Sequence, residues 1–266
     1  MAGFLQARIG LLLAASATGI AEPAASRQAD DRFPIVELRQ YTLHDGQRDV
    51  LIDLFEREFV ESQEALGMKV IGTFTDLDRP NRFVWIRGFH DMDARLVGLS
   101  AFYGGPIWKA HSAAANETMI DSDNVLLLEA PNTNAQFTLP PTRPALGEST
   151  PAGLVTATIY YLKVPPSEAA SQFRRRVAPR LAREGVRPLA WFITETATNN
   201  FPRLPVREGE RVVVWFAAFT SDADRKAHRI AFVHAAIALA PLLSREPEVL
   251  RLKPTSRSLI RGSPKP

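Results

Sequence analysis

The sequence contains no cysteine among its 266 residues. Disulfide bonds, thiolate nucleophiles, cysteine-ligated zinc and iron–sulfur clusters are therefore all excluded. Neither sign of charge predominates, because the sequence has 32 lysines and arginines and 29 aspartates and glutamates. A net charge of +3 does not indicate a nucleic-acid binder. No apolar run after residue 21 is long enough to cross a membrane, so stable membrane insertion is not expected.

Signature motifs of several enzyme classes are absent as well. The five histidines include no pair spaced by four residues and no His-Glu-x-x-His motif, so we expect no dedicated metal site. Neither Gly-x-Ser-x-Gly nor Gly-x-Gly-x-x-Gly occurs, which leaves hydrolase and dinucleotide-binding functions unsupported. We predict no resident cofactor, and whether the protein is an enzyme stays open. The composition is that of a globular protein with a buried core.

The first 21 residues have the pattern of a targeting segment. Arg8 precedes a short apolar run at 9–15, and small residues end the segment before Glu22. A basic start, a short apolar core and small residues at the cleavage site predict a secretory signal peptide over residues 1–21. An amphipathic transit peptide is the alternative. We expect the mature protein to be periplasmic or secreted.

Composition divides the rest of the chain into five parts. Two regions carry apolar patterning, and the sequence between them is rich in proline. We predict a flexible lead-in at 22–33, a first unit at 34–130, a proline-rich linker at 131–152, a second unit at 153–254 and a tail at 255–266.

The two patterned regions look like copies of one another. Three strand-like blocks recur in the same order, and Tyr41 of the first region aligns with Tyr160 of the second. The matched blocks are 35–43 with 154–162, 83–89 with 213–219, and 125–130 with 249–254. Three matches in one order predict an internal repeat with a divergent second copy.

Each copy has the pattern strand, helix, strand, strand, helix, strand. Asp91 suits a helix N-cap, and Pro106 suits the first turn of a helix that runs to Met119. This βαββαβ order is the ferredoxin-like unit of the α+β class, which leaves one sheet face bare. Two units in one chain can cover each other's bare faces, and the space between the sheets is then the expected ligand cavity. The first-copy strands are predicted at 35–43, 68–76, 82–89 and 124–129.

Three segments of the first copy carry a family resemblance. They read Phe-Val-Trp-Ile-Arg-Gly-Phe at 83–89, Ala-Phe-Tyr-Gly-Gly-Pro-Ile-Trp-Lys-Ala-His at 101–111 and Asp-Ser-Asp-Asn-Val-Leu-Leu-Leu at 121–128. Together they resemble the NIPSNAP family, specifically over 35–130 and more weakly over 154–253. The resemblance implies tandem ferredoxin-like (βαββαβ) repeats packed as an intrachain dimeric α/β barrel.

The resemblance also implies membership of the dimeric α/β-barrel superfamily. This superfamily includes cofactor-free oxygenases, haem-binding proteins and stress-responsive barrels, so the resemblance does not identify a reaction. The second copy lacks the Phe-Tyr-Gly-Gly-Pro stretch. We therefore expect the first copy to carry most of any functional site.

Two histidines are candidates for chemistry. On the predicted helix that starts at Pro106, His111 shares a stripe with Trp108 and could act as an acid/base group or a haem ligand. His234 lies within an apolar face of a second-copy helix, so the two histidines could point into one cavity. The alternative for both is a structural histidine on a helix face.

Cationic and aromatic residues of the first copy are the candidates for ligand binding. Arg39 and Tyr41 share one face of the first strand, and Trp85 and Arg87 share a face of another strand. A cation beside aromatic rings could hold a carboxylate or a flat molecule. Tyr103 stands before two glycines whose flexible backbone allows close approach to a ligand. Packing and ion pairs at the barrel interface are the alternative interpretation.

Together these features predict an exported NIPSNAP-like α/β-barrel protein that binds a small, largely apolar or aromatic molecule in an inter-sheet cavity. One alternative is a cofactor-free oxygenase or isomerase that uses His111 as acid/base, with Arg39 or Tyr41 orienting the substrate. Another is haem binding through His111 or His234. A homo-oligomer is compatible with the sequence, and the ligand's identity stays open.

Overall fold

The computed structural model describes residues 32–262, which lie within one compact unit. The predicted signal peptide and most of the lead-in lie outside the described residues. The first half contains β1 (Ile35–Leu43), α1 (Arg48–Leu54), the π-helix η1 (Phe55–Phe59), α2 (Val60–Glu64), β2 (Lys69–Asp76), β3 (Arg82–Phe89), α3 (Met92–Gly104), α4 (Pro106–Glu117) and β4 (Met119–Glu129). The second half contains η2 (Thr133–Ala135), β5 (Leu154–Tyr161), α5 (Pro166–Gln172), the π-helix η3 (Phe173–Val177), α6 (Ala178–Arg183), β6 (Ala190–Thr194), β7 (Val212–Phe219), α7 (Asp222–Ala227), α8 (Arg229–Leu239), η4 (Ala240–Leu242) and β8 (Glu248–Pro254).

Local chemistry explains where several helices begin. The Asp91 carboxylate accepts a hydrogen bond from the Ala94 backbone N–H at 2.7 Å and so caps α3, and Pro106 starts α4. Ser221 caps α7 in the same way through the N–H of Asp224. The cap at Asp91 and the start at Pro106 are thus confirmed. None of the helices within 32–262 is long and apolar enough to cross a membrane.

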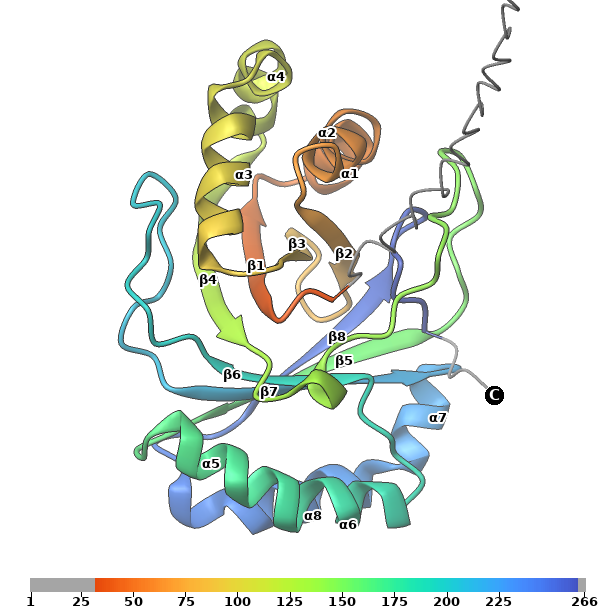
Figure 1. The fold of residues 1–266 in the computed structure, drawn as a ribbon. Coiled ribbons are helices and arrows are strands. Elements are labelled where there is room, and N and C mark those ends of the chain that lie inside the picture. Colours follow the sequence, from red (N-terminus) through yellow and green to blue (C-terminus); the bar gives the residue numbers. More distant parts are fainter. Residues whose placement is uncertain (1–31, 263–266) are drawn as a thin grey trace, which may run out of the picture. The chain divides into compact units, whose positions relative to one another are not determined.

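The eight strands form one closed barrel in the order β1-β3-β2-β8-β5-β7-β6-β4 (Figure 1). Neighbouring strands pair antiparallel, and the two halves join through β2–β8 and β4–β6. The helices of the first half lie on one side of the barrel and those of the second half on the other (Figure 1). The predicted mixed α/β fold with a barrel is confirmed, as one closed sheet rather than two sheets that face each other.

The interior of the barrel is filled with side chains. Residues alternate along a strand, so Val36 and Leu38 point inward while Glu37 and Arg39 point toward the helices. An eight-stranded barrel is just wide enough for its interior to be packed in this way. The predicted ligand cavity between the sheets is therefore wrong, because apolar side chains occupy that space. Members of this interior cluster include Phe74, Val84, Ile86, Leu126, Leu128, Val155, Ala157, Ile159, Val214 and Leu252.

Parts of the predicted linker and tail also belong to the packed core. Phe137 packs against the interior cluster, with its ring centroid 5.0 Å from that of Phe216 and 5.4 Å from that of Phe192. Ile260 is a buried member of the same cluster, and Ser258 is fully buried beside it in the chain. The proline-rich composition of these segments did not indicate the apolar side chains that anchor them.

We expect Phe137→Ala to lower the free energy of unfolding by at least about 2 kcal/mol, because a packed ring is replaced by a cavity. Leu146→Ala is the matched control in the same linker, since Leu146 is 55% exposed and its truncation is expected to change stability by less than about 0.5 kcal/mol. Chemical denaturation of both variants measures the difference. Equal losses in the two variants would show that the linker does not contribute to the core.

Candidate functional site

Charged residues of the first half are buried between the sheet and its helices. Glu37, Arg39 and Tyr41 lie on one side of β1, because each is two residues from the next. That side faces the helices, since Val36 and Leu38 point into the barrel. The antiparallel register places Arg87 opposite Glu37 and Trp85 opposite Arg39 on β3. Each of these five side chains is buried, and the charged ones have no solvent exposure. The predicted candidates therefore meet on the outer face of the barrel, not in its interior.

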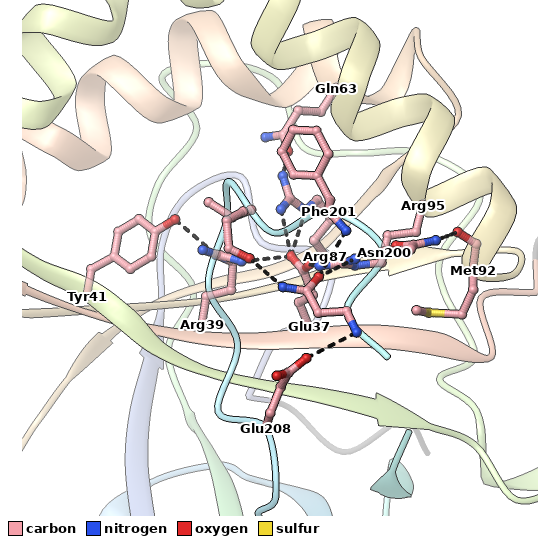
Figure 2. Close-up of polar contacts among 12 residues, drawn as sticks. Glu37, Arg39, Tyr41, Gln63, Arg87, Met92, Arg95, Asn200, Phe201 and Glu208 are labelled. Atoms are coloured by element: carbon pink, nitrogen blue, oxygen red, sulfur yellow. Dashed lines mark hydrogen bonds and ion pairs between the residues drawn. The ribbon is translucent and has the colours of Figure 1, made fainter. Parts of the chain in front are cut away.

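The Glu37 carboxylate is the centre of this group (Figure 2). Its Oε2 atom accepts from Arg39 Nη1 at 2.9 Å and from Arg87 Nη2 at 2.6 Å. Its Oε1 atom accepts from Arg95 Nε, on α3, at 2.8 Å. We call these four residues, Glu37, Arg39, Arg87 and Arg95, the charge cluster. One carboxylate and three guanidinium groups leave two positive charges in excess.

The ionisation of Glu37 follows from these contacts. Burial by itself raises the pKa of Glu37, but Arg87, Arg39 and Arg95 together lower it well below its usual range. For Tyr41, burial raises the pKa and outweighs the opposing effect of Arg39. At neutral pH the site therefore contains a carboxylate, three guanidinium groups and a protonated phenol.

Neutral groups complete most of the hydrogen bonds of the arginines. Arg39 Nε donates to the Tyr41 hydroxyl at 3.0 Å, and Arg87 Nη1 donates to Gln63 Oε1 at 2.8 Å. The Arg87 guanidinium also lies 5.0 Å from the ring centroid of Trp85, within cation–π range. Within the described part of the chain, Arg39 Nη2 and Trp85 Nε1 are buried and have no hydrogen-bond partner.

A small cavity of about 30 Å³ lies beside the charge cluster. Tyr41, Gln63 and Trp85 contribute to its walls from the polar side. We call it the aromatic cavity, because its remaining walls are mostly aromatic rings. In this conformation it has room for about one or two water molecules. The other lining residues are Leu51, Phe55, Phe59, Phe102, Tyr103, Trp108, Ala115 and Met119.

A loop from the second half covers this site. Residues 195–211, between β6 and β7, are called the cover loop here (Figure 1). Arg95 Nη1 donates to Asn200 Oδ1 at 2.7 Å (Figure 2) and to Asn199 Oδ1 at 3.0 Å. The Phe201 ring stacks on Tyr103 with centroids 5.8 Å apart. The second half therefore closes a site whose charged and aromatic residues come from the first half.

Sequence reasoning found part of this site and missed the rest. It identified Arg39 and Arg87 but not Glu37, although Glu37 is two residues before Arg39 and so shares its face. Arg95 carries no comparable signal, because its place on α3 becomes informative only when the helix lies on the sheet. Asn199 and Asn200 belong to a loop more than 100 residues away, so no local pattern connects them to Arg95.

The two histidines do not line the aromatic cavity. His111 Nε2 lies 3.5 Å from Glu58 Oε2, and its side chain is 31% exposed. His234, on α8, lies with Nδ1 2.5 Å from Glu184 Oε1 and is 43% exposed. The expectation that both point into one cavity is corrected, because they belong to helix layers on opposite sides of the barrel (Figure 1). Within 32–262, no three histidine or acidic side chains gather as metal ligands would.

The second half offers an internal comparison for this site. Its strands pair in the matching register, so Thr156, Thr158 and Tyr160 on β5 occupy the positions that Glu37, Arg39 and Tyr41 occupy on β1. On β7, Trp215 lies opposite Thr158 and Ala217 opposite Thr156, matching Trp85 and Arg87. The tyrosine and the tryptophan are thus present in both halves, while the charges are present in one. The fold of a half does not require the charge cluster.

We expect Glu37→Gln to lower the free energy of unfolding by about 3–5 kcal/mol, because three buried arginines lose the one ion-pair partner that they have within residues 32–262. A variant that replaces the buried network with apolar residues of similar size, E37L/R39M/Q63L/R87M/R95M, should stay within about 2 kcal/mol of the wild type. Denaturant unfolding measures both. If the apolar variant is as unstable as Glu37→Gln, the cluster is a requirement of the fold.

The same experiment has a pH dependence with a definite sign. The pKa of Glu37 in the folded protein lies below its ordinary value of 4.5. Its contribution to stability is therefore complete above that value and is lost as the pH falls toward the folded-state pKa. The stability gap between wild type and Glu37→Gln should narrow below about pH 5, by about 1.4 kcal/mol per pH unit.

Comparison with known proteins agrees with this geometry. Residues 36–132 match the NIPSNAP family model, and no curated protein sequence matches the chain. A proposed monooxygenase from Fusobacterium nucleatum is similar in structure, with a TM-score of 0.55 and 12% identity over 88% of this chain and 97% of that protein. A proposed monooxygenase from Lactobacillus acidophilus has a TM-score of 0.52 and 13% identity over 86% and 98%. An anthrone oxidase-like protein has a TM-score of 0.53 and 12% identity over 88% and 98%.

At these identities the solved structures show the shared fold and not a shared reaction. The family match covers the half that carries the site, since the whole charge cluster falls within residues 36–132. The cover loop at 195–211 falls outside it. The resemblance carried by the segments 83–89, 101–111 and 121–128 is confirmed, because all three segments lie within the residues that match the NIPSNAP family model.

Proposed function

We propose that the first half binds a small, largely aromatic molecule between its sheet and its helices, at the aromatic cavity. The observation that supports this most directly is a cavity with aromatic walls that lies beside buried polar donors without partners. Ligand sites are typically lined by apolar and aromatic groups, with a few polar groups that fix orientation. Buried donors that lack a partner in the protein are suited to bind one from a ligand.

The aromatic cavity must widen to admit a ring. A cavity of about 150 Å³ accommodates benzene in engineered proteins, several times the present volume of about 30 Å³. Tyr103 and Trp108 form part of its wall, and both side chains are only partly buried. Tyr103 also stacks on Phe201 of the cover loop. Rotation of these rings toward solvent, together with a shift of the cover loop, is the proposed route to the binding conformation.

The proposal concerns binding rather than a particular reaction. The monooxygenase-like neighbours share an architecture at 12–13% identity, which carries no catalytic residue over to this chain. His111, the expected acid/base group of the oxygenase alternative, pairs with Glu58 and does not line the cavity. Tyr41 and Arg39 are better placed to orient a bound molecule. Tyr41 lines the cavity, and Arg39 donates a hydrogen bond to the Tyr41 hydroxyl.

The proposal also covers the relationship between the two halves and the export of the protein. We infer that the two halves are divergent copies of one ferredoxin-like unit, supported by their common element order and by the matching registers of β1–β3 and β5–β7. We infer export from the sequence of residues 1–21, where Arg8 precedes an apolar run and small residues. The first half then carries the ligand site in the exported protein.

Binding is tested with N-phenyl-1-naphthylamine, an uncharged aromatic probe whose fluorescence rises in apolar surroundings. We expect the wild-type protein to enhance its fluorescence in a saturable way. Ala115→Met should abolish the enhancement, because Ala115 is a buried lining residue and the longer side chain fills the cavity. Ala235→Met is the matched control, a buried alanine on a second-half helix. No saturable signal, or equal signals from both variants, would rule out the cavity as the binding site.

Export is tested by N-terminal sequencing of the protein recovered from a bacterial expression host. We expect a mature chain that begins at Glu22, in the periplasmic or extracellular fraction. A chain that retains Met1 in the cytoplasmic fraction would contradict the export proposal. A variant with Leu12 replaced by Arg is the control, because a charge within the apolar core should block cleavage.

A further inference from the structure

The charge cluster contains more positive charge than the protein neutralises. Arg39, Arg87 and Arg95 each form an ion pair with Glu37, and their ion pairs within the described residues go to no other acid. All four side chains have no solvent exposure. A buried charge without a partner destabilises a protein strongly, so two excess guanidinium charges in one buried site need an explanation.

The fold does not provide that explanation. The second half places threonines and an alanine at the corresponding strand positions, and it forms the same strand register around Tyr160 and Trp215. Gln63, which accepts from Arg87, has Leu181 as its counterpart eight residues after the first residue of the corresponding π-helix. The entire polar network is therefore a special feature of the first half. An arrangement that is not needed for folding and that carries excess charge is typical of a ligand site.

Arg39 has capacity left to bind a further group, whereas Arg95 Nη2, which also lacks a hydrogen bond, lies 2.7 Å from Glu37 Oε1 in an ion pair. Its Nε donates to Tyr41 and its Nη1 donates to Glu37, while Nη2 is buried without a partner. The guanidinium also lies 5.6 Å from the ring centroid of Trp85. Tyr41 and Trp85 both line the aromatic cavity, so Arg39 contacts two of its walls. The free Nε1 of Trp85 is a second donor at the same place.

We infer that the molecule bound in the aromatic cavity is an aromatic carboxylate, whose anionic oxygens are held by Arg39. This inference rests on the proposed function, since it names the chemical class of the ligand for the same cavity. A carboxylate neutralises part of the excess positive charge and accepts from the unpartnered Nη2. Hydrogen bonds between a guanidinium and a carboxylate are about twice as strong as those between neutral groups. The aromatic part of the ligand would lie among the rings of Phe55, Phe59 and Trp108.

Glu37 and the cover loop have supporting roles in this assignment. Glu37 fixes the orientation of Arg39 and keeps the site from carrying a third uncompensated charge. Arg95 is engaged by Glu37 and by Asn199 and Asn200, so it serves to attach the cover loop. Arg87 is engaged by Glu37 and Gln63 and is a structural member of the network. Arg39 is therefore the residue whose replacement separates ligand recognition from the stability of the site.

The experiment measures how tightly two molecules of similar shape bind, from their ability to displace N-phenyl-1-naphthylamine from the protein. One is 2-naphthoate, which is anionic at pH 7.5, and the other is 2-naphthamide, which is neutral and of nearly the same shape. We expect the wild-type protein to bind the acid at least tenfold more tightly than the amide. Arg39→Met should remove this preference, because it weakens the binding of the acid at least tenfold more than the binding of the amide. Arg82→Met, a change of a partly buried arginine on the same strand as Trp85, should keep the preference.

The possible results separate this inference from the proposed function. If the uncharged probe binds but the acid competes no better than the amide, the carboxylate assignment is wrong while the aromatic site stands. If the uncharged probe does not bind at all, the proposed function fails and the inference fails with it. If folded Arg39→Met keeps the full preference for the acid, Arg39 is not the residue that holds the anion. The ratio of the wild-type affinities for the acid and the amide is measured without any variant. The inference therefore remains testable even if Arg39→Met does not fold.

Discussion

A single buried carboxylate connects the parts of the structure that matter for the site. Glu37 holds guanidinium groups from its own strand, from the neighbouring strand β3 and from the helix α3. Through Arg95, the same contact reaches the cover loop of the second half. Because these side chains are fully buried, the charge-assisted contacts are strong, but each donor that lacks a partner destabilises the site. The positions of Arg39, Arg87 and Arg95 are therefore coupled through Glu37.

The two halves of the chain build similar surroundings with different chemistry. Both place a tyrosine and a tryptophan at matching positions on adjacent strands, and both interrupt the first helix with a π-helix. The second half surrounds these residues with threonine, alanine and leucine, which require no ion pairs. The first half surrounds them with Glu37, three arginines and Gln63. The shared apolar framework serves the fold, and the polar residues serve the ligand binding that we propose for the first half.

The second half does more than follow the element order of the first half. Its strands β8 and β6 pair with β2 and β4, so neither edge of the first sheet is left open. Its inward side chains, such as Val155 and Ile159, fill the barrel together with Val36 and Leu38. Its cover loop then closes the charged site with Asn199, Asn200 and Phe201. The second half thus closes the sheet, completes the barrel core and covers a site located in the first half.

Several features of the protein follow from local sequence alone. Period-two alternation places Arg39 and Tyr41 on one face, and the Asp91 cap and Pro106 mark helix starts, because strand pleating and helix termini depend on near neighbours. The matched blocks around Tyr41 and Tyr160 indicated a barrel built from two similar parts, because blocks that recur in one order along the chain are visible in the sequence. Tertiary structure decided the rest. Whether a strand face meets the interior or the helices depends on how the sheet closes, so the interior is packed and the charges lie outside it. Arg95 and Asn200 meet only because a helix and a loop 105 positions apart in the chain converge, and no local pattern records that distance.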